Sequence, residues 1–283
     1  MRSTLAILVV LLAANVAFAQ GNAGNSSAPA QATTTAPPAA QHQPQAKSAE
    51  EYGAYNAAAA LTDPGQIVAA ADAFVQKYPN SELKELLYVR AMQIYQQQNN
   101  SAQVITAGRK AIAINPQNPV TLIEVASALV MDTRENDLDR EARFAEAAKD
   151  AQAGIDNIDT GLQVPPTVSA AQVAAAKANY RSIAYETLGI IAMNGKDYAT
   201  AEQNFQKAAD FMKDQPEAEV YLRLSVVQDN QKKYPEALDS ANKALQYAAE
   251  GSAEKNLAKQ QQARLQKLIS EQAATAPAAT TPH

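Results

Sequence analysis

Polar and apolar residues alternate with the period of an α-helix between about Ser48 and Ser270. Apolar side chains recur at every third or fourth position, which places them on one face of a helix. The clearest run contains Val173, Ala176, Tyr180, Ile183, Ala184, Thr187, Leu188 and Ile191. No window of the sequence shows the sustained two-residue alternation of a half-buried strand. The pattern therefore predicts an all-α domain over residues 48–270.

Helix start signals divide this stretch into short helices. Asp63 and Asn118 each precede a proline, which is the arrangement of an N-cap residue before a proline at the first helical position. Ser169 is followed three residues later by Gln172, which is the pattern of a capping box. The signals predict helical hairpins with about a dozen residues per helix.

One hairpin carries a recognisable repeat pattern. Its residues are Tyr185, Leu188, Gly189, Ala192, Ala201, Phe205 and Ala208. This spacing resembles the tetratricopeptide repeat, although Ala192 stands where the family pattern has a tyrosine. The small residues Gly189 and Ala201 match the places where two helices of the repeat approach most closely.

The same frame can be followed along the chain. The predicted units are residues 50–81, 85–118, 119–161, 182–215 and 218–251, with a capping helix at 254–270. In the third unit, Asp132 to Arg140 is an insertion in the turn. Residues 162–181 fit no repeat, and we interpret them as a proline-rich loop followed by an N-terminal extension of the helix that carries Tyr185. The cap has an apolar stripe of Leu257, Leu265, Leu268 and Ile269 that would cover the last hairpin.

A single hairpin is too small to fold alone, so each hairpin must stack on a neighbour. The resemblance implies that the stacked hairpins form a right-handed superhelical solenoid with a concave inner surface. In that family the first helix of each hairpin lines the groove. The corresponding candidate partner-binding residues are Gln93, Gln97, Ile123, Ser127, Glu186, Ile190, Met193, Asn194, Leu222, Val226, Asp229 and Asn230. Some proteins of that family bind a C-terminal carboxylate through lysines in the groove. The positions of those lysines are occupied here by Val89, Ile123, Glu186 and Leu222, so this mode of binding is not expected.

The two ends of the chain differ from the repeat core. Residues 1–19 have the pattern of a secretory signal peptide. The pattern consists of the charged Arg2, the apolar run Leu5–Ala14 and the small residues Ala17 and Ala19 before the cleavage site. The apolar run is too short to cross a hydrocarbon core of about 30 Å. Residues 20–47 and 271–283 are rich in Ala, Thr and Pro, a composition that predicts a disordered linker and a disordered tail.

Composition narrows the possible chemistry. The chain has no Cys and no Trp, and its two histidines, His42 and His283, lie in the predicted linker and at the last position. The absence of thiols excludes disulfides, zinc-thiolate sites and cysteine nucleophiles. We therefore predict no catalytic residue, no cofactor and no metal site. Five carboxylates within residues 132–141 could bind calcium, but the segment lacks the EF-hand spacing and contains arginines, so a solvated acidic loop is the preferred interpretation.

The charge of the chain bears on its partners. The formal net charge is -5, and the basic residues are scattered singly, which disfavours nucleic acid. The sequence thus predicts a non-catalytic scaffold or adaptor, periplasmic or secreted, that binds a peptide or protein in the groove of a repeat solenoid. Two alternatives stay open: an enzyme of the cell wall that uses carboxylates, and a structural envelope protein that assembles with itself. The identity of the partner and the oligomeric state are not specified.

Overall fold

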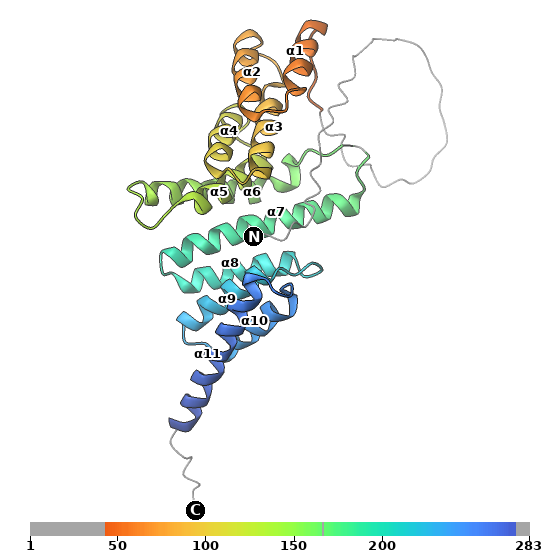
Figure 1. The fold of residues 1–283 in the computed structure, drawn as a ribbon. Coiled ribbons are helices and arrows are strands. Elements are labelled where there is room, and N and C mark those ends of the chain that lie inside the picture. Colours follow the sequence, from red (N-terminus) through yellow and green to blue (C-terminus); the bar gives the residue numbers. More distant parts are fainter. Residues whose placement is uncertain (1–42, 166, 276–283) are drawn as a thin grey trace, which may run out of the picture. The chain divides into compact units, whose positions relative to one another are not determined.

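The computed structural model describes residues 43–165 and 167–275 (Figure 1). In these two ranges the chain forms eleven α-helices and no strand, which confirms the predicted all-α helical-repeat fold. The predicted signal peptide, the linker up to residue 42 and the tail from residue 276 lie outside the described residues. Within the described part of the chain, no helix is long and apolar enough to span a membrane.

The chain divides into two compact units. The N-terminal unit contains the described residues up to Pro116 together with the segment around residues 163–168, and the C-terminal unit contains Gln117–Leu162 and the residues from Ser169 onward. The sequence predicted one uninterrupted row of hairpins over 48–270. In the structure the first two hairpins belong to one compact unit and the later hairpins to the other.

The N-terminal unit consists of two helical hairpins. Its helices are α1 (Ala49–Ala59), α2 (Pro64–Lys77), α3 (Lys84–Gln97) and α4 (Ser101–Ile114). The predicted cap at Asp63 is present, since its Oδ1 accepts from the amide of Gln66 at 2.8 Å. Ile67, Ala71 and Leu87 are fully buried between these helices.

The C-terminal unit is a longer row of helices. It contains α5 (Pro119–Asp132), α6 (Arg140–Gly161), α7 (Ala170–Asn194), α8 (Tyr198–Phe211), α9 (Ala218–Asn230), α10 (Tyr234–Tyr247) and α11 (Ala253–Thr275). Each helix packs on the next, as Figure 1 shows, and the first helices of successive hairpins also meet, since α5 packs on α7 and α9 on α11. This is the contact pattern of stacked hairpins.

Capping at the start of α7 follows the sequence closely. The amide of Gln172 donates to Ser169 Oγ at 3.3 Å, and the amide of Ser169 donates to Gln172 Oε1 at 3.0 Å. This reciprocal pair is the predicted capping box, and it starts a helix that runs without a break to Asn194. At the other end of the chain α11 continues to Thr275, past the predicted boundary at residue 270.

Two successive hairpins of the C-terminal unit repeat the same surface cluster. Tyr185 stacks on Phe211 with ring centroids 5.8 Å apart, and one repeat later Tyr221 meets Tyr247 at 5.4 Å. A lysine lies over the tyrosine in each pair, Lys207 in the first and Lys243 in the second. The recurrence shows that Tyr185 and Tyr221 take part in equivalent packing contacts, and that α7–α8 and α9–α10 are copies of one structural unit.

Candidate binding groove

An open groove lies on the C-terminal unit between the end of α7, the face of α9 and the start of α11. Its volume is about 300 Å³. The apolar lining consists of Met193, Leu222, Val226, Ala253 and Leu257, and the charged lining consists of Glu219, Arg223 and Glu254. We refer to this site as the α9 groove.

The periodicity of α9 determines which of its residues line the groove. Glu219, Leu222, Arg223 and Val226 follow one another at three and four positions and therefore share one helix face. The opposite face carries Val220, Leu224 and Val227, which are buried against neighbouring helices. Because the buried face fixes the rotation of α9 about its axis, the opposite face is held toward the groove and α9 need not rotate to expose it.

The cap helix α11 supplies the remaining wall. Its position is set by polar bonds to α9: Gln261 Nε2 donates to Asp229 Oδ2 at 3.0 Å, and Arg264 forms an ion pair with the same carboxylate. Ala258 and Leu265 are fully buried below the helix. Leu257 points the other way and is 52% exposed, so it is an accessible large apolar side chain of the groove.

Arg223 is bound on both sides by carboxylates. It forms an ion pair with Glu219 on its own helix, and its Nε lies 3.3 Å from Glu186 Oε1 on α7. That Nε is buried and makes no hydrogen bond of good geometry. Glu254 stands apart from this network. Its own amide and the Ser252 hydroxyl hold the pKa of Glu254 below its usual value, so its carboxylate is charged at neutral pH.

The structure brings together some of the predicted residues. Met193, Leu222 and Val226 line the groove, and Ile190 is half-buried beside Met193 against the core around Phe205. Other predicted residues have different roles: Glu186 is held by Arg223, and Asp229 anchors α11. Asn194 and Asn230 are exposed, and each donates to a carbonyl one turn earlier in its own helix.

Two of the predicted residues cannot line an open groove. Ile123 is 0% exposed and Ser127 is also buried. A Cβ on Gly154 would lie 2.4 Å from Ile123 Cγ1, so Ile123 fills the space where α5 and α6 come closest. The prediction was wrong here because α6 and α7 both pack on α5 and leave it no open inner face.

Gln93 and Gln97 belong to α3 of the N-terminal unit. Gln93 is half-buried and Gln97 is exposed. The N-terminal unit has a pocket of its own, of about 350 Å³, between α1 and α2. Its walls are mostly alanine, together with Leu61, Phe74, Lys77 and Tyr78, and neither glutamine lines it.

Sequence reasoning missed five lining residues of the α9 groove: Glu219, Arg223, Ala253, Glu254 and Leu257. The charged residues of α9 could have been found by continuing the helical spacing from Leu222 and Val226. Leu257 was assigned to the buried stripe of the cap, because its apolar character gives no indication of which side of a terminal helix faces the last hairpin.

The acidic insertion is an ordered turn. Arg143 donates to Asp132 Oδ2 at 2.7 Å and to Thr133 Oγ1 at 2.8 Å, and the amide of Arg134 donates to Asp137 Oδ2 at 2.8 Å. Residues 43–165 and 167–275 contain no group of acidic or histidine side chains arranged to hold a metal ion. Leu138 at the tip of the turn is fully exposed.

Comparison with known proteins gives similarity of fold only. No protein-family model matches the chain, and no curated protein matches it in sequence. Among solved structures it is similar to the assembly chaperone of RpL4, Acl4 (16% identity, TM-score 0.49, covering 80% of this chain and 92% of that one). It is also similar to pilF of Pseudomonas aeruginosa (14% identity, TM-score 0.48, covering 80% of this chain and 93% of that one). A third similar structure is that of the MamA protein (16% identity, TM-score 0.41, covering 70% of this chain and 98% of that one). These are tetratricopeptide-like repeat proteins, the family that the sequence resembles. The hairpin contacts of the two units show the helical repeat directly.

Proposed function

We propose that this chain is a non-catalytic interaction scaffold that holds a segment of a protein partner in the α9 groove. The observation that carries the proposal is the open apolar surface of Met193, Leu222, Val226 and Leu257 on a rigid stack of helices. A concave, mostly apolar lining with a few charged groups is the usual form of a binding site. A groove of about 300 Å³ accommodates a few side chains, as in the docking of a helix or an extended peptide.

The fixed position of the groove supports binding. α9 and α11 are held by buried apolar residues and by the Asp229 bonds to Gln261 and Arg264. A preformed surface loses little conformational entropy on binding, so more of the contact energy remains as affinity. The flexible component of the complex is then the partner segment.

The charges of the groove favour binding over catalysis. Cleavage of a glycosidic bond needs a carboxylic acid whose pKa is raised by an apolar environment. Glu219 is paired with Arg223, and the pKa of Glu254 is lowered. The Glu254 carboxyl group is therefore not suited to donate a proton at neutral pH.

We further propose that the protein is exported and acts in the cell envelope or outside the cell. This rests on the charged start, the apolar run Leu5–Ala14 and the cleavage pattern that ends at Ala19. N-terminal sequencing of the protein recovered outside the cytoplasm should begin at Gln20. Retention of the full-length chain in the cytoplasm would contradict this part of the proposal.

Site-directed crosslinking tests the groove. A photo-reactive phenylalanine analogue at Leu257 of the mature chain should capture a protein from an envelope extract, and Leu222→Asp should abolish this capture by placing a charge in the apolar lining. The same analogue at Leu138, which is fully exposed outside the groove, serves as the matched control. Capture through Leu257 that survives Leu222→Asp in a folded variant would refute groove binding.

A further inference from the structure

The α9 groove has an excess of negative charge. Among its lining residues, all within the described chain, Glu219 and Glu254 are acidic and Arg223 is basic. Arg223 is not available to a ligand as a free cation, because Glu219 and Glu186 both approach its guanidinium. Counting Glu186 behind the lining, the site holds three carboxylates and one arginine, and two of the carboxylates approach that arginine.

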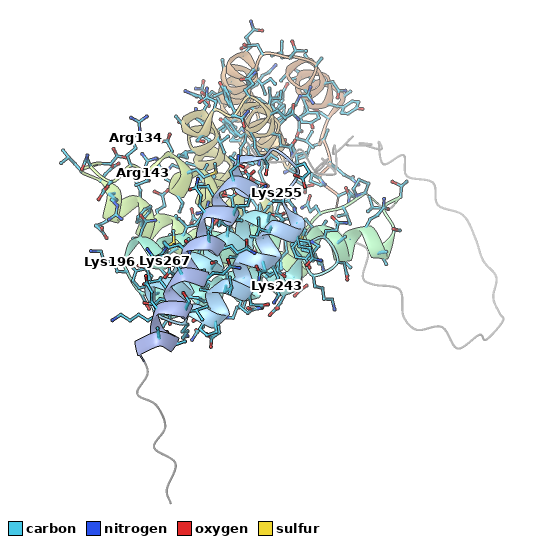
Figure 2. All side chains as sticks on the ribbon, turned by 60° about the horizontal axis from the view of Figure 1, so that its bottom comes forward. Arg134, Arg143, Lys196, Lys243, Lys255 and Lys267 are labelled. Atoms are coloured by element: carbon cyan, nitrogen blue, oxygen red, sulfur yellow. The ribbon has the colours of Figure 1, made fainter. Side chains whose placement is uncertain are left out.

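Neighbouring cations do not restore neutrality. Lys255 follows directly after Glu254, but its ammonium is paired with Glu250 and its side chain is only 17% exposed. Arg264 is paired with Asp229. Figure 2 shows Lys255 and Lys267 well separated along α11, and Lys267 lies within reach of Glu271 at 3.8 Å.

We infer that the groove takes a basic amphipathic segment, in which an apolar anchor is flanked by lysine or arginine. This inference rests on the proposed function. The anchor would enter between Leu222, Val226 and Leu257, and the cation would lie beside Glu219 or Glu254. Complementary charge at the edge of an interface favours such a partner and repels an acidic one.

The same charges disfavour two other occupants. A C-terminal carboxylate would approach Glu219 and Glu254 without a free cation to receive it. The chain's own residues 276–283 contain apolar alanine and proline but no lysine or arginine, so they lack the charge that the groove would select.

A pair of matched peptides provides the test. The first probe is a short fluorescent amphipathic peptide with leucine on one face and lysine on the other, and the second has glutamate in place of each lysine. By fluorescence anisotropy, the lysine peptide should bind the mature chain at least about tenfold more tightly, with an affinity that falls as salt is added.

Neutralising the groove should reduce this preference. An exposed ion pair changes affinity by about two- to fivefold, so Glu219→Gln combined with Glu254→Gln should weaken the lysine peptide by roughly four- to twenty-fivefold. The control is Glu236→Gln, which removes an exposed carboxylate outside the groove. Circular dichroism of each variant verifies that the helices are intact.

The outcomes separate this inference from the proposed function. Equal binding of both peptides, or a lysine-peptide affinity unchanged by the double substitution, would overturn the charge preference and leave groove binding standing. If neither peptide binds while crosslinking at Leu257 still captures a protein, the inference is again refuted and the function survives. If neither peptide binds and crosslinking captures nothing, both fail.

Discussion

Gly189 and Phe205 meet where α7 and α8 come closest. A Cβ on Gly189 would lie 2.7 Å from Phe205 Cε1, which is closer than real side chains approach. Phe205 is itself 0% exposed and packs with Ala201, Leu224 and Val227, so its ring cannot move aside. The pair thereby sets the spacing of α7, α8 and α9, and two of these helices, α7 and α9, also line the groove.

Gly189→Ala should destabilise the C-terminal unit. Overpacking typically costs about 1–3 kcal/mol, and the better helix propensity of alanine offsets up to about 1 kcal/mol of it. A net loss of about 1–2 kcal/mol in the free energy of unfolding is therefore expected in urea denaturation.

Two comparisons sharpen that measurement. Gly195→Ala, at a helix end where the nearest other atom is 3.4 Å from the added methyl group, should be close to neutral. In a Phe205→Leu background the cost of Gly189→Ala should shrink, because the contacting ring edge is gone. An undiminished cost would show that the ring is not the obstacle.

Phe205→Ala should lower the stability by about 3–5 kcal/mol, the usual penalty for removing a buried aromatic side chain. The ring is enclosed by residues of α8 and α9 and by Gly189 of α7, so little relaxation can fill the cavity. Thermal or urea unfolding gives the value. A change below about 1 kcal/mol would mean that Phe205 does not lie between stacked helices.

Asp229→Ala should loosen the cap helix. The substitution removes the acceptor of Gln261 and the partner of Arg264, and the Asp229 carboxylate is almost fully buried. Loss of a buried charged partner costs about 1–3 kcal/mol, and limited proteolysis should cut within Ala253–Thr275 faster than in the wild type. Asp239→Asn removes an exposed i,i+4 pair with Lys243 and should leave the cleavage rate unchanged. Equal rates for both variants would contradict the anchoring role of Asp229.

Glu202 should make the stability depend on pH. Burial alone would raise its pKa, but bonds from Lys233 at 2.6 Å, Gln231 at 2.8 Å and Gln228 at 3.1 Å outweigh burial and hold the pKa of Glu202 below its usual value. Its contribution is therefore present above the unfolded value of about 4.3 and is lost as the pH falls through the folded-state pKa. As the pH is lowered into the acid range, the urea midpoint of unfolding should fall less steeply for Glu202→Gln than for the wild type or for the control Glu236→Gln. Parallel curves would contradict this role.

The sequence predicted the elements well because their signals are local. The caps at Asp63, Asn118 and Ser169 depend only on a side chain and the next few amides, and all three are present. The close approach at Gly189 followed from the repeat pattern. The division into two units was not predicted, because boundaries between stacked hairpins depend on contacts between distant residues.

The candidate site was predicted only in part. Repeat spacing located Met193, Leu222 and Val226 because regular hairpins present equivalent faces. It failed at Ile123, where the long α6 and α7 cover a face that is open in a regular repeat. It also failed at Leu257, since the orientation of a terminal helix depends on which of its faces the preceding hairpin buries.

Methyl NMR of the mature chain tests the central claim most directly. Titration with the lysine-leucine peptide should shift the methyl signals of Met193, Leu222, Val226 and Leu257 together, because these groups line one groove. The buried methyl groups of Leu87 and Met92 in the N-terminal unit should not move. Shifts confined to residues outside the α9 groove, with the four lining methyl signals unchanged, would contradict the account.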